Sequence, residues 1–419
     1  AVPWNGQFPA GKGGLMVTLA ALTPLVAVLL LLVLLRLPAS VAMPLSLAAT
    51  AAVGAAVWQV PVRHIAAAAL EGAVVALSIL WIVFGAILLL KILTASGALA
   101  RIRAGFVAVS PDPRVQIVLV GWLFVSFLEG AAGFGTPAAI TAPLLVALGF
   151  APLAAVVLPL VADSSAVSFG AIGTPVLVGL TEGLQEGGAS AAVGQALAGR
   201  TVPGFVAEVA VTAVAMDVLI GSFVPLVLVA IYTRFFGEAR TWRAGLRMWR
   251  LALVAGFSFT LTALVVARLL GPEFPSLVGG LVGLLVTLAA LRSGLISPRL
   301  EHRIPVDSLR ETQPAAAIGL GLAWMPYVLL VAVLVATRLP ALPLKAWLQS
   351  VRLTWENILG TGIDATLVPL YLPGTAFLAV VLLTVPLHRL AAAKAAGALG
   401  EALVATARAA LPLMAAVAM

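Results

Sequence analysis

One carboxylate, Glu129, lies in a long stretch that carries no other charge, WLFVSFLEGAAGFGTPAAITAPLLVALGF (residues 122–150). An ionised carboxyl group inside a membrane costs about 3 kcal/mol or more, so such a group usually faces a partner or a cavity, or holds a proton. We therefore predict that Glu129 carries a proton or organises a site. The structural alternative is that Glu129 is protonated, or caps the amides of the following turn, and merely fastens a tight helix pair.

The residues after Glu129, GAAGFGTP (130–137), offer backbone amides without side-chain cover, and a helix restarts at Pro137, a favoured first helical residue. A helix N-terminus attracts carboxylates, so the string predicts an anion site. It is neither a phosphate-binding P-loop nor the dinucleotide pattern, because the required Lys-Ser/Thr and glycine spacing are missing. Small-residue packing between helices is the alternative. The candidate substrate-binding residues here are Gly130, Gly133, Gly135 and Thr136.

A second polar interruption, ADSSAVSFGAIGTP (162–175), repeats this arrangement with Asp163 as its acid. Two such breaks predict two half-helix ends that meet near the middle of the membrane. The hydroxyl groups are candidates for binding a substrate hydroxyl or carboxylate, although serines in apolar helices more often bond their own i−4 carbonyl. Asp163 is a second candidate for proton coupling, and the candidate substrate-binding hydroxyls are Ser164, Ser165, Ser168 and Thr174.

Composition identifies the class of protein that must position these residues. The chain has 419 residues, of which 62% are hydrophobic and 10% charged, and its mean hydropathy is +1.16. A single water-soluble core cannot hide that much apolar surface, so we predict an integral membrane protein, with residues 1–419 as one transmembrane domain. The net charge of +8 comes from arginines in short connections, which indicates membrane topology and no nucleic-acid partner.

Cysteine is absent, which excludes disulfides and thiolate metal sites, and the three histidines share no ligand spacing. We therefore expect neither a metal nor a cofactor. The sequence carries no signal for an oligomeric state.

Apolar runs of about 20 residues, the length that crosses a bilayer, recur along the chain. Because lipid-facing backbone must satisfy its own hydrogen bonds and no barrel pattern is present, we predict an all-α, polytopic fold in the lipid bilayer. The Gly- and Pro-rich region 115–181 predicts broken or re-entrant helices that form the substrate site. Connections 232–250 and 292–314 are rich in arginine and predicted to be cytoplasmic, which puts the turn at 271–275 and the N-terminus outside. The expected spans are 15–35, 41–60, 72–90, 202–231, 251–266, 276–291, 315–337, 370–387 and 402–419.

The stretch FLEGAAGFGTPAAITAPLLVALGFAPLAAVVLPLVADSSAVSFGAIGTPV (127–176) strongly resembles the L-lactate permease family, which also contains glycolate permeases. Weaker resemblance covers nearly the whole chain, including PDPRVQIVLVGW (111–122), AMDV (215–218) and GPEFPSLVGGLVGLL (271–285). The resemblance implies a secondary transporter, built from inverted repeats, that takes up L-lactate, D-lactate and glycolate with protons across the bacterial inner membrane. The substrate carboxylate is then expected at residues 130–135, with Glu129 as the protonatable group.

Two departures from the family pattern bear on this expectation. Family members often carry Asn, a hydroxyl residue and Pro where this chain has Asp163, serines and Ala166. The family also continues past Met419 with a further polar break, so its C-terminal part is expected to be missing here. A truncated, non-transporting membrane module and a sodium-coupled carboxylate transporter are therefore the alternatives. An intramembrane enzyme is less favoured, because no nucleophile–base pair or ligand set accompanies Glu129.

Overall fold

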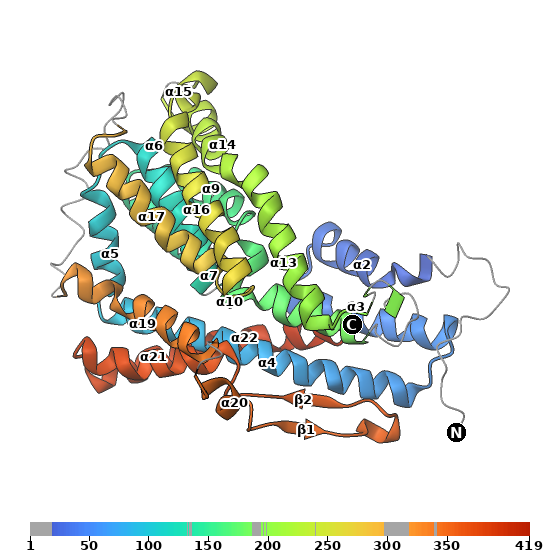
Figure 1. The fold of residues 1–419 in the computed structure, drawn as a ribbon. Helices are drawn as coiled ribbons and strands as arrows, with labels where there is room; N and C mark the ends of the chain where they lie inside the picture. Colours follow the sequence, from blue (N-terminus) through green and yellow to red (C-terminus); the bar gives the residue numbers. More distant parts are fainter. Residues whose placement is uncertain are drawn as a thin grey trace. The chain divides into compact units, whose positions relative to one another are not determined.

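The computed structural model of the protein is mostly helical (Figure 1). It describes residues 19–131, 133, 136–186, 194–195, 197, 199–238, 240–296, 318–338 and 342–419. Within these residues, seven helices are long and apolar enough to cross a membrane, and the count rises to eight if one bent pair of helices is a single span. The polytopic helical fold predicted from composition is confirmed.

The described chain forms two compact units. The first contains residues 19–85, 342–375 and 399–419, and the second contains the described parts of 86–338 together with 376–398. Three helices belong partly to each unit: α4 (Val62–Ala95), α21 (Pro373–Leu387) and α22 (Ala392–Val417). Two of them differ from prediction, because α4 and α22 each begin ten residues before the expected spans 72–90 and 402–419. Alanine-rich segments with high helix propensity precede both apolar runs and extend the helices.

In the first unit, α2 (Thr23–Val28) and the π-helical η1 (Leu29–Leu34) pack on α3 (Ala39–Val57). The short helix α20 (Leu344–Leu348) precedes a β-hairpin of β1 (Leu353–Trp355) and β2 (Ala365–Leu367), which pair antiparallel with Thr354 opposite Thr366.

This hairpin was not predicted, and the all-α prediction is wrong there. Its turn is made by Asn357, which has a φ of 51° and accepts a hydrogen bond from the Gly362 amide at 2.9 Å. Asn and Gly tolerate the left-handed backbone that such a turn requires, and β-branched threonines favour strands. The sequence signal is therefore present in residues 353–367, but it is short and lies between strongly apolar runs.

The core of the second unit is a helical run from Pro113 to Ala131 that is buried throughout. It comprises α6 (Pro113–Gln116), the π-helical η2 (Ile117–Phe124) and α7 (Val125–Ala131). Sequence analysis did not include it among the spans, because the region was expected to be broken throughout. It breaks only after Ala131, since the glycines and prolines are concentrated beyond that residue.

Two antiparallel helices, α16 (Trp249–Leu269) and α17 (Pro275–Arg292), pack against each other, and α17 also packs against α7. Glycines on α17 allow this close approach: a Cβ atom on Gly280 would lie 2.6 Å from the Phe127 Cα atom. Rings of α7 also contact α19 (Leu320–Arg338), with the Phe127 and Tyr327 centroids 4.9 Å apart. The acid-bearing end of α7 is thus held by tight packing.

Broken helices are confirmed in the region 115–181 for one bent pair. Helix α8 (Thr136–Ala147) packs on α9 (Pro152–Asp163), and the chain then bends by 67° into the segment Val167–Leu180. That segment contains the elements η3 (Val167–Phe169), α10 (Gly170–Thr174) and η4 (Pro175–Leu180), and is followed by α11 (Thr181–Glu186).

The remaining helices of the second unit are α5 (Ala98–Val107), α13 (Val202–Leu219), η6 (Gly221–Phe223), α14 (Val224–Ile231), η7 (Tyr232–Phe236) and α15 (Trp242–Leu246). The predicted span 202–231 is therefore interrupted by η6. The predicted connection 232–250 contains α15, and residues 297–314 of the other predicted connection lie outside the described residues.

Candidate functional site

The two polar breaks meet in the second unit. A Cβ atom on Gly133 would lie 2.7 Å from the backbone nitrogen of Ala171, and one on Gly170 would collide with the Glu129 carboxyl group. Only glycine fits where backbone and carboxyl group approach so closely. The contact between the two interruptions, predicted from their composition, is therefore present.

The start of α17 forms a third wall of this site. A Cβ atom on Gly130 would collide with the backbone nitrogen of Leu277, and one on Gly173 with the carbonyl oxygen of Pro272. Gly130 lies inside α7, so its amide belongs to that helix and the glycine serves close packing. The breaks meet at the level of the first turn of α17, which is 18 residues long and spans about 27 Å, and not halfway along it.

The second break contains a left-handed turn. Ala171, Ile172 and Gly173 have φ values of 42°, 58° and 71°, and the Thr174 hydroxyl closes the turn by donating to the Ala171 carbonyl oxygen at 2.6 Å. A left-handed conformation costs a residue with a Cβ atom about 1–2 kcal/mol. Such strain persists only where surrounding structure holds it, and it concentrates at functional sites.

Glu129 and Asp163 form an acid pair at this junction. Glu129 is 2% exposed, Asp163 is half-buried at the end of α9, and the two carboxyl groups interact electrostatically with each other. Two carboxyl groups can bond to each other only if one of them carries a proton, because carboxylates are acceptors. Oε2 of Glu129 and Oδ1 of Asp163 are buried without a partner among the described residues. The geometry therefore suits one shared proton.

The predicted hydroxyls mostly bond their own helices, in line with the structural alternative. Ser165 donates to the Ala162 carbonyl at 3.1 Å and accepts from Trp122 Nε1 at 3.1 Å, while the exposed Ser164 donates to the Val161 carbonyl at 2.7 Å. Ser168 is half-buried in η3. Gly135 lies outside the described residues, and of Thr136 only the main chain, as the first residue of α8, is described.

Two residues before and within α17 were missed by sequence analysis. Ser276 is 1% exposed and donates to the Ala166 carbonyl oxygen at 2.8 Å, and Glu273, in the preceding turn, is 8% exposed. The sequence GPEFP (271–275) was interpreted as a tight turn on the outside because it is short, and Ser276 as the first residue of a span. A carboxylate and a serine beside the helix-starting Pro275 are the signal that could have identified a buried helix start.

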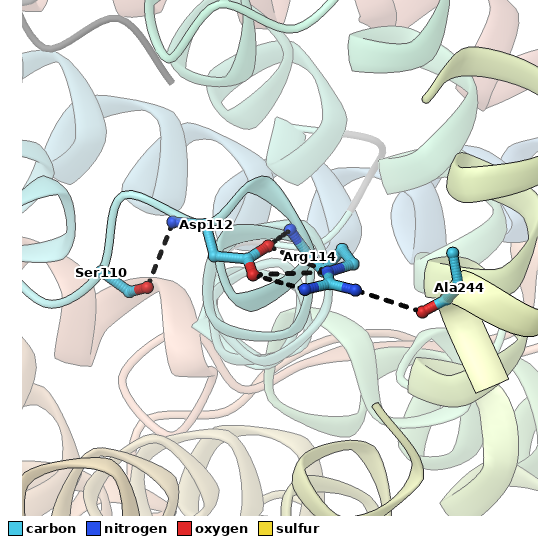
Figure 2. Close-up of polar contacts among 4 residues, drawn as sticks. All are labelled: Ser110, Asp112, Arg114 and Ala244. Atoms are coloured by element: carbon cyan, nitrogen blue, oxygen red, sulfur yellow. Dashed lines mark hydrogen bonds and ion pairs between the residues drawn. The ribbon is translucent and has the colours of Figure 1, made fainter. Parts of the chain in front are cut away.

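A second buried cluster lies near the other end of the Pro113–Ala131 run (Figure 2). Arg114 Nη2 donates to Asp112 Oδ2 at 2.8 Å, and Arg114 Nη1 donates to the Ala244 carbonyl oxygen at 3.3 Å. Asp112 Oδ1 also accepts from the Arg114 amide at 2.9 Å, so this carboxylate caps α6. Sequence analysis interpreted the arginines of short connections, Arg114 among them, as topology signals and did not predict that Arg114 is buried, at 4% exposure.

In the described residues, no group of three or more His, Cys, Asp or Glu side chains is placed to hold a metal ion. The acid pair can hold a proton. It offers no nucleophile with an adjacent base.

Comparisons with known proteins support a transport role. A family model described as L-lactate permease matches residues 17–419. Glycolate permease GlcA of Escherichia coli (strain K12) is 36% identical over 291 residues, which are 69% of this chain and 47% of that protein. The L-lactate permease of Bacillus subtilis (strain 168) is 30% identical over 393 residues, 90% of this chain and 64% of that protein.

The L-lactate permease of Escherichia coli (strain K12) is 33% identical over 284 residues, 67% of this chain and 47% of that protein. This chain thus spans about half to two thirds of the length of these relatives. No solved structure matches it. The protein is a multi-pass membrane protein homologous to bacterial transporters, not to enzymes, and the chain belongs to the L-lactate permease family.

Proposed function

We propose that this protein is a secondary active transporter that takes up L-lactate and related 2-hydroxymonocarboxylates, D-lactate and glycolate among them, together with protons. The observation that carries the proposal is the buried carboxyl group of Glu129, which contacts Gly170 where the two breaks meet and interacts with a second acid, Asp163. The relatives are named for L-lactate and glycolate, which share one carboxylate and a neighbouring hydroxyl group. An anion of this kind crosses without net charge if one proton accompanies it.

The substrate carboxylate binds, in this proposal, at the first break between the acid pair and the beginning of α8. Helix N-termini favour anions, and the half-helix ends of broken helices are where transporters place such groups. Glu129 holds the proton beside the anion, where burial strengthens the interaction between them. We further propose that the architecture follows an inverted repeat, with this junction as the site of one repeat.

The test is uptake of labelled L-lactate into proteoliposomes with and without an inward proton gradient. Gradient-driven accumulation is expected from the unmodified protein, and Glu129→Gln is expected to abolish it while leaving folded protein in the membrane. Glu208→Gln is the matched control, because Glu208 is an exposed acid that pairs with Arg200. Accumulation unchanged by Glu129→Gln would contradict the assignment.

Sodium coupling is the second candidate, favoured by the buried, unpartnered oxygens of Glu129 and Asp163. Carboxylate and hydroxyl oxygens at a broken helix are suitable ligands for Na⁺ as well as for a proton. Uptake in a sodium-free buffer with an imposed pH gradient distinguishes the two. Accumulation that persists in this buffer contradicts sodium coupling. Accumulation that requires Na⁺ contradicts coupling through a shared proton.

A further inference from the structure

Ser126 is a buried hydroxyl that the acid pair does not use. It lies in α7, it is 0% exposed, and its Oγ has no hydrogen-bond partner among the described residues. Some buried helical hydroxyls in this protein donate to the carbonyl four residues earlier, as Thr141 does to Pro137 and Thr384 to Val380, both at 2.7 Å. Burial of an unpaired hydroxyl is unfavourable. Of the three buried helical hydroxyls without a partner in the described residues, Ser46, Ser126 and Thr287, Ser126 is the one on the helix that carries Glu129.

The position of Ser126 brings it next to Glu129. The two residues are three apart on α7, which puts their Cβ atoms about 5–6 Å apart on one side of the helix. Side chains on a helix lean toward its N-terminus, so the Glu129 side chain extends over the Ser126 turn. Trp122, one turn further back, bonds Ser165, so this side of the helix faces the second break.

Four described donors around the acid pair are already engaged. The hydroxyls of Ser165, Thr174 and Ser276 donate to carbonyl oxygens, and the Trp122 indole donates to Ser165. No lysine, arginine or histidine occurs in α8, α9 or α10, which are the elements that bring the second break to α7. Apart from Glu129, the titratable side chains described at the junction are Asp163 and Glu273. Both are acids, which cannot compensate a negative charge on Glu129.

We propose that Ser126 is the positioning residue that donates a hydrogen bond to the Glu129 carboxylate once the shared proton has left. While the proton is present, the pair bonds within itself and the serine is unused. When it departs, the site gains one negative charge and loses that bond, and the Ser126 hydroxyl turns to Glu129 while keeping its own proton. This assignment rests on the proposed proton-coupled function.

Two modes of transport separate this role from a merely structural one. In the exchange mode, labelled substrate on one side of the membrane replaces unlabelled substrate on the other, so the transporter does not have to reorient with an empty, deprotonated site. Net uptake requires the transporter to reorient with its site empty and deprotonated. A hydrogen bond to a charged group changes an equilibrium by about tenfold or more, so Ser126→Ala is expected to slow net uptake by about tenfold while exchange stays within about twofold.

Thr287→Val is the matched control, because Thr287 is also 0% exposed with an unpartnered hydroxyl, on α17 but eleven residues beyond Ser276. Neither mode of transport is expected to change in this variant. Ser126→Ala should be at least as stable to heat as the parent, since it removes an unpaired polar group. An equal loss of both modes, or no loss of net uptake, overturns the proposal.

Infrared difference spectroscopy tests the same contact without transport. The carboxylate stretching band of Glu129 at high pH is identified by its loss in Glu129→Gln, and it is expected to shift in Ser126→Ala but not in Thr287→Val. A protein that shows this shift without lactate uptake refutes the proposed symport but retains the Ser126 contact. An unshifted band overturns the contact, whatever the uptake result.

Discussion

Glu129 Oε1 occupies the place that a Cβ atom on Gly170 would need, so the acid of the first break rests on bare backbone of the second. The two residues are far apart in sequence and belong to different elements, α7 and α10. Their contact holds the carboxyl group at a place where the described residues supply no cationic partner. The absence of a side chain at position 170 is therefore part of the site.

Gly170→Ala is expected to displace the Glu129 carboxyl group and to lower gradient-driven uptake at least about tenfold, because small misplacements of a reacting group carry costs of that order. Uptake is measured beside membrane insertion. Gly179→Ala is the control, since an added Cβ there meets nothing within 4 Å. Normal uptake by Gly170→Ala would mean that the carboxyl group works equally well elsewhere.

Gly173 is expected to be more sensitive to substitution than an ordinary left-handed glycine. Gly173→Ala combines a φ of 71° with a collision against the Pro272 carbonyl oxygen, whereas Gly97, with a φ of 77°, has no neighbour within 4 Å of an added Cβ. The left-handed conformation alone costs about 1–2 kcal/mol, so Gly97→Ala should lower stability by that much and Gly173→Ala by more. Thermal unfolding in detergent measures both, and equal losses would contradict the close approach.

Arg114→Ala is expected to lower the free energy of unfolding strongly, because Arg114 is a buried charged residue with a buried partner. It leaves the Asp112 carboxylate buried at 0% exposure without its guanidinium, and breaking a buried pair in this way costs about 3–5 kcal/mol. Arg243→Ala, next to the Ala244 carbonyl but exposed, is the control and should stay within about 0.5 kcal/mol. Denaturant unfolding of the two variants measures the difference, and similar midpoints would refute the buried pair.

The sequence predicts which residues belong to this site better than it predicts how they contact one another. Spanning helices follow from apolar length alone, and Glu129 and Asp163 were each identifiable as acids in apolar surroundings. Their pairing depends on the 67° bend after α9 and on the left-handed turn at Ala171 and Ile172. Alanine and isoleucine rarely adopt that conformation, so no local pattern indicates it. The burial of Arg114 was equally hidden, because PDPR has the composition of a surface loop.

The two acids of the pair should not be equivalent. An asparagine at position 163 still offers an N–H donor to the Glu129 carboxylate, so Asp163→Asn keeps the hydrogen bond without a shared proton. Gln at position 129 removes the group that is buried most deeply and rests on Gly170. We therefore expect Asp163→Asn to retain gradient-driven uptake within about tenfold, since one neutral hydrogen bond replaces another, while Glu129→Gln loses it.

Proteoliposome uptake at matched protein insertion measures this asymmetry. Asp217→Asn serves as the control, because Asp217 is an acid on α13, outside the junction. If Asp163→Asn abolishes uptake as fully as Glu129→Gln, the proton is held jointly and neither acid suffices. If Asp163→Asn abolishes uptake and Glu129→Gln does not, Asp163 on the second break carries the transported proton and Glu129 is its hydrogen-bond partner. The retained activity expected here would place the transported proton on Glu129, with residue 163 acting as its hydrogen-bond partner.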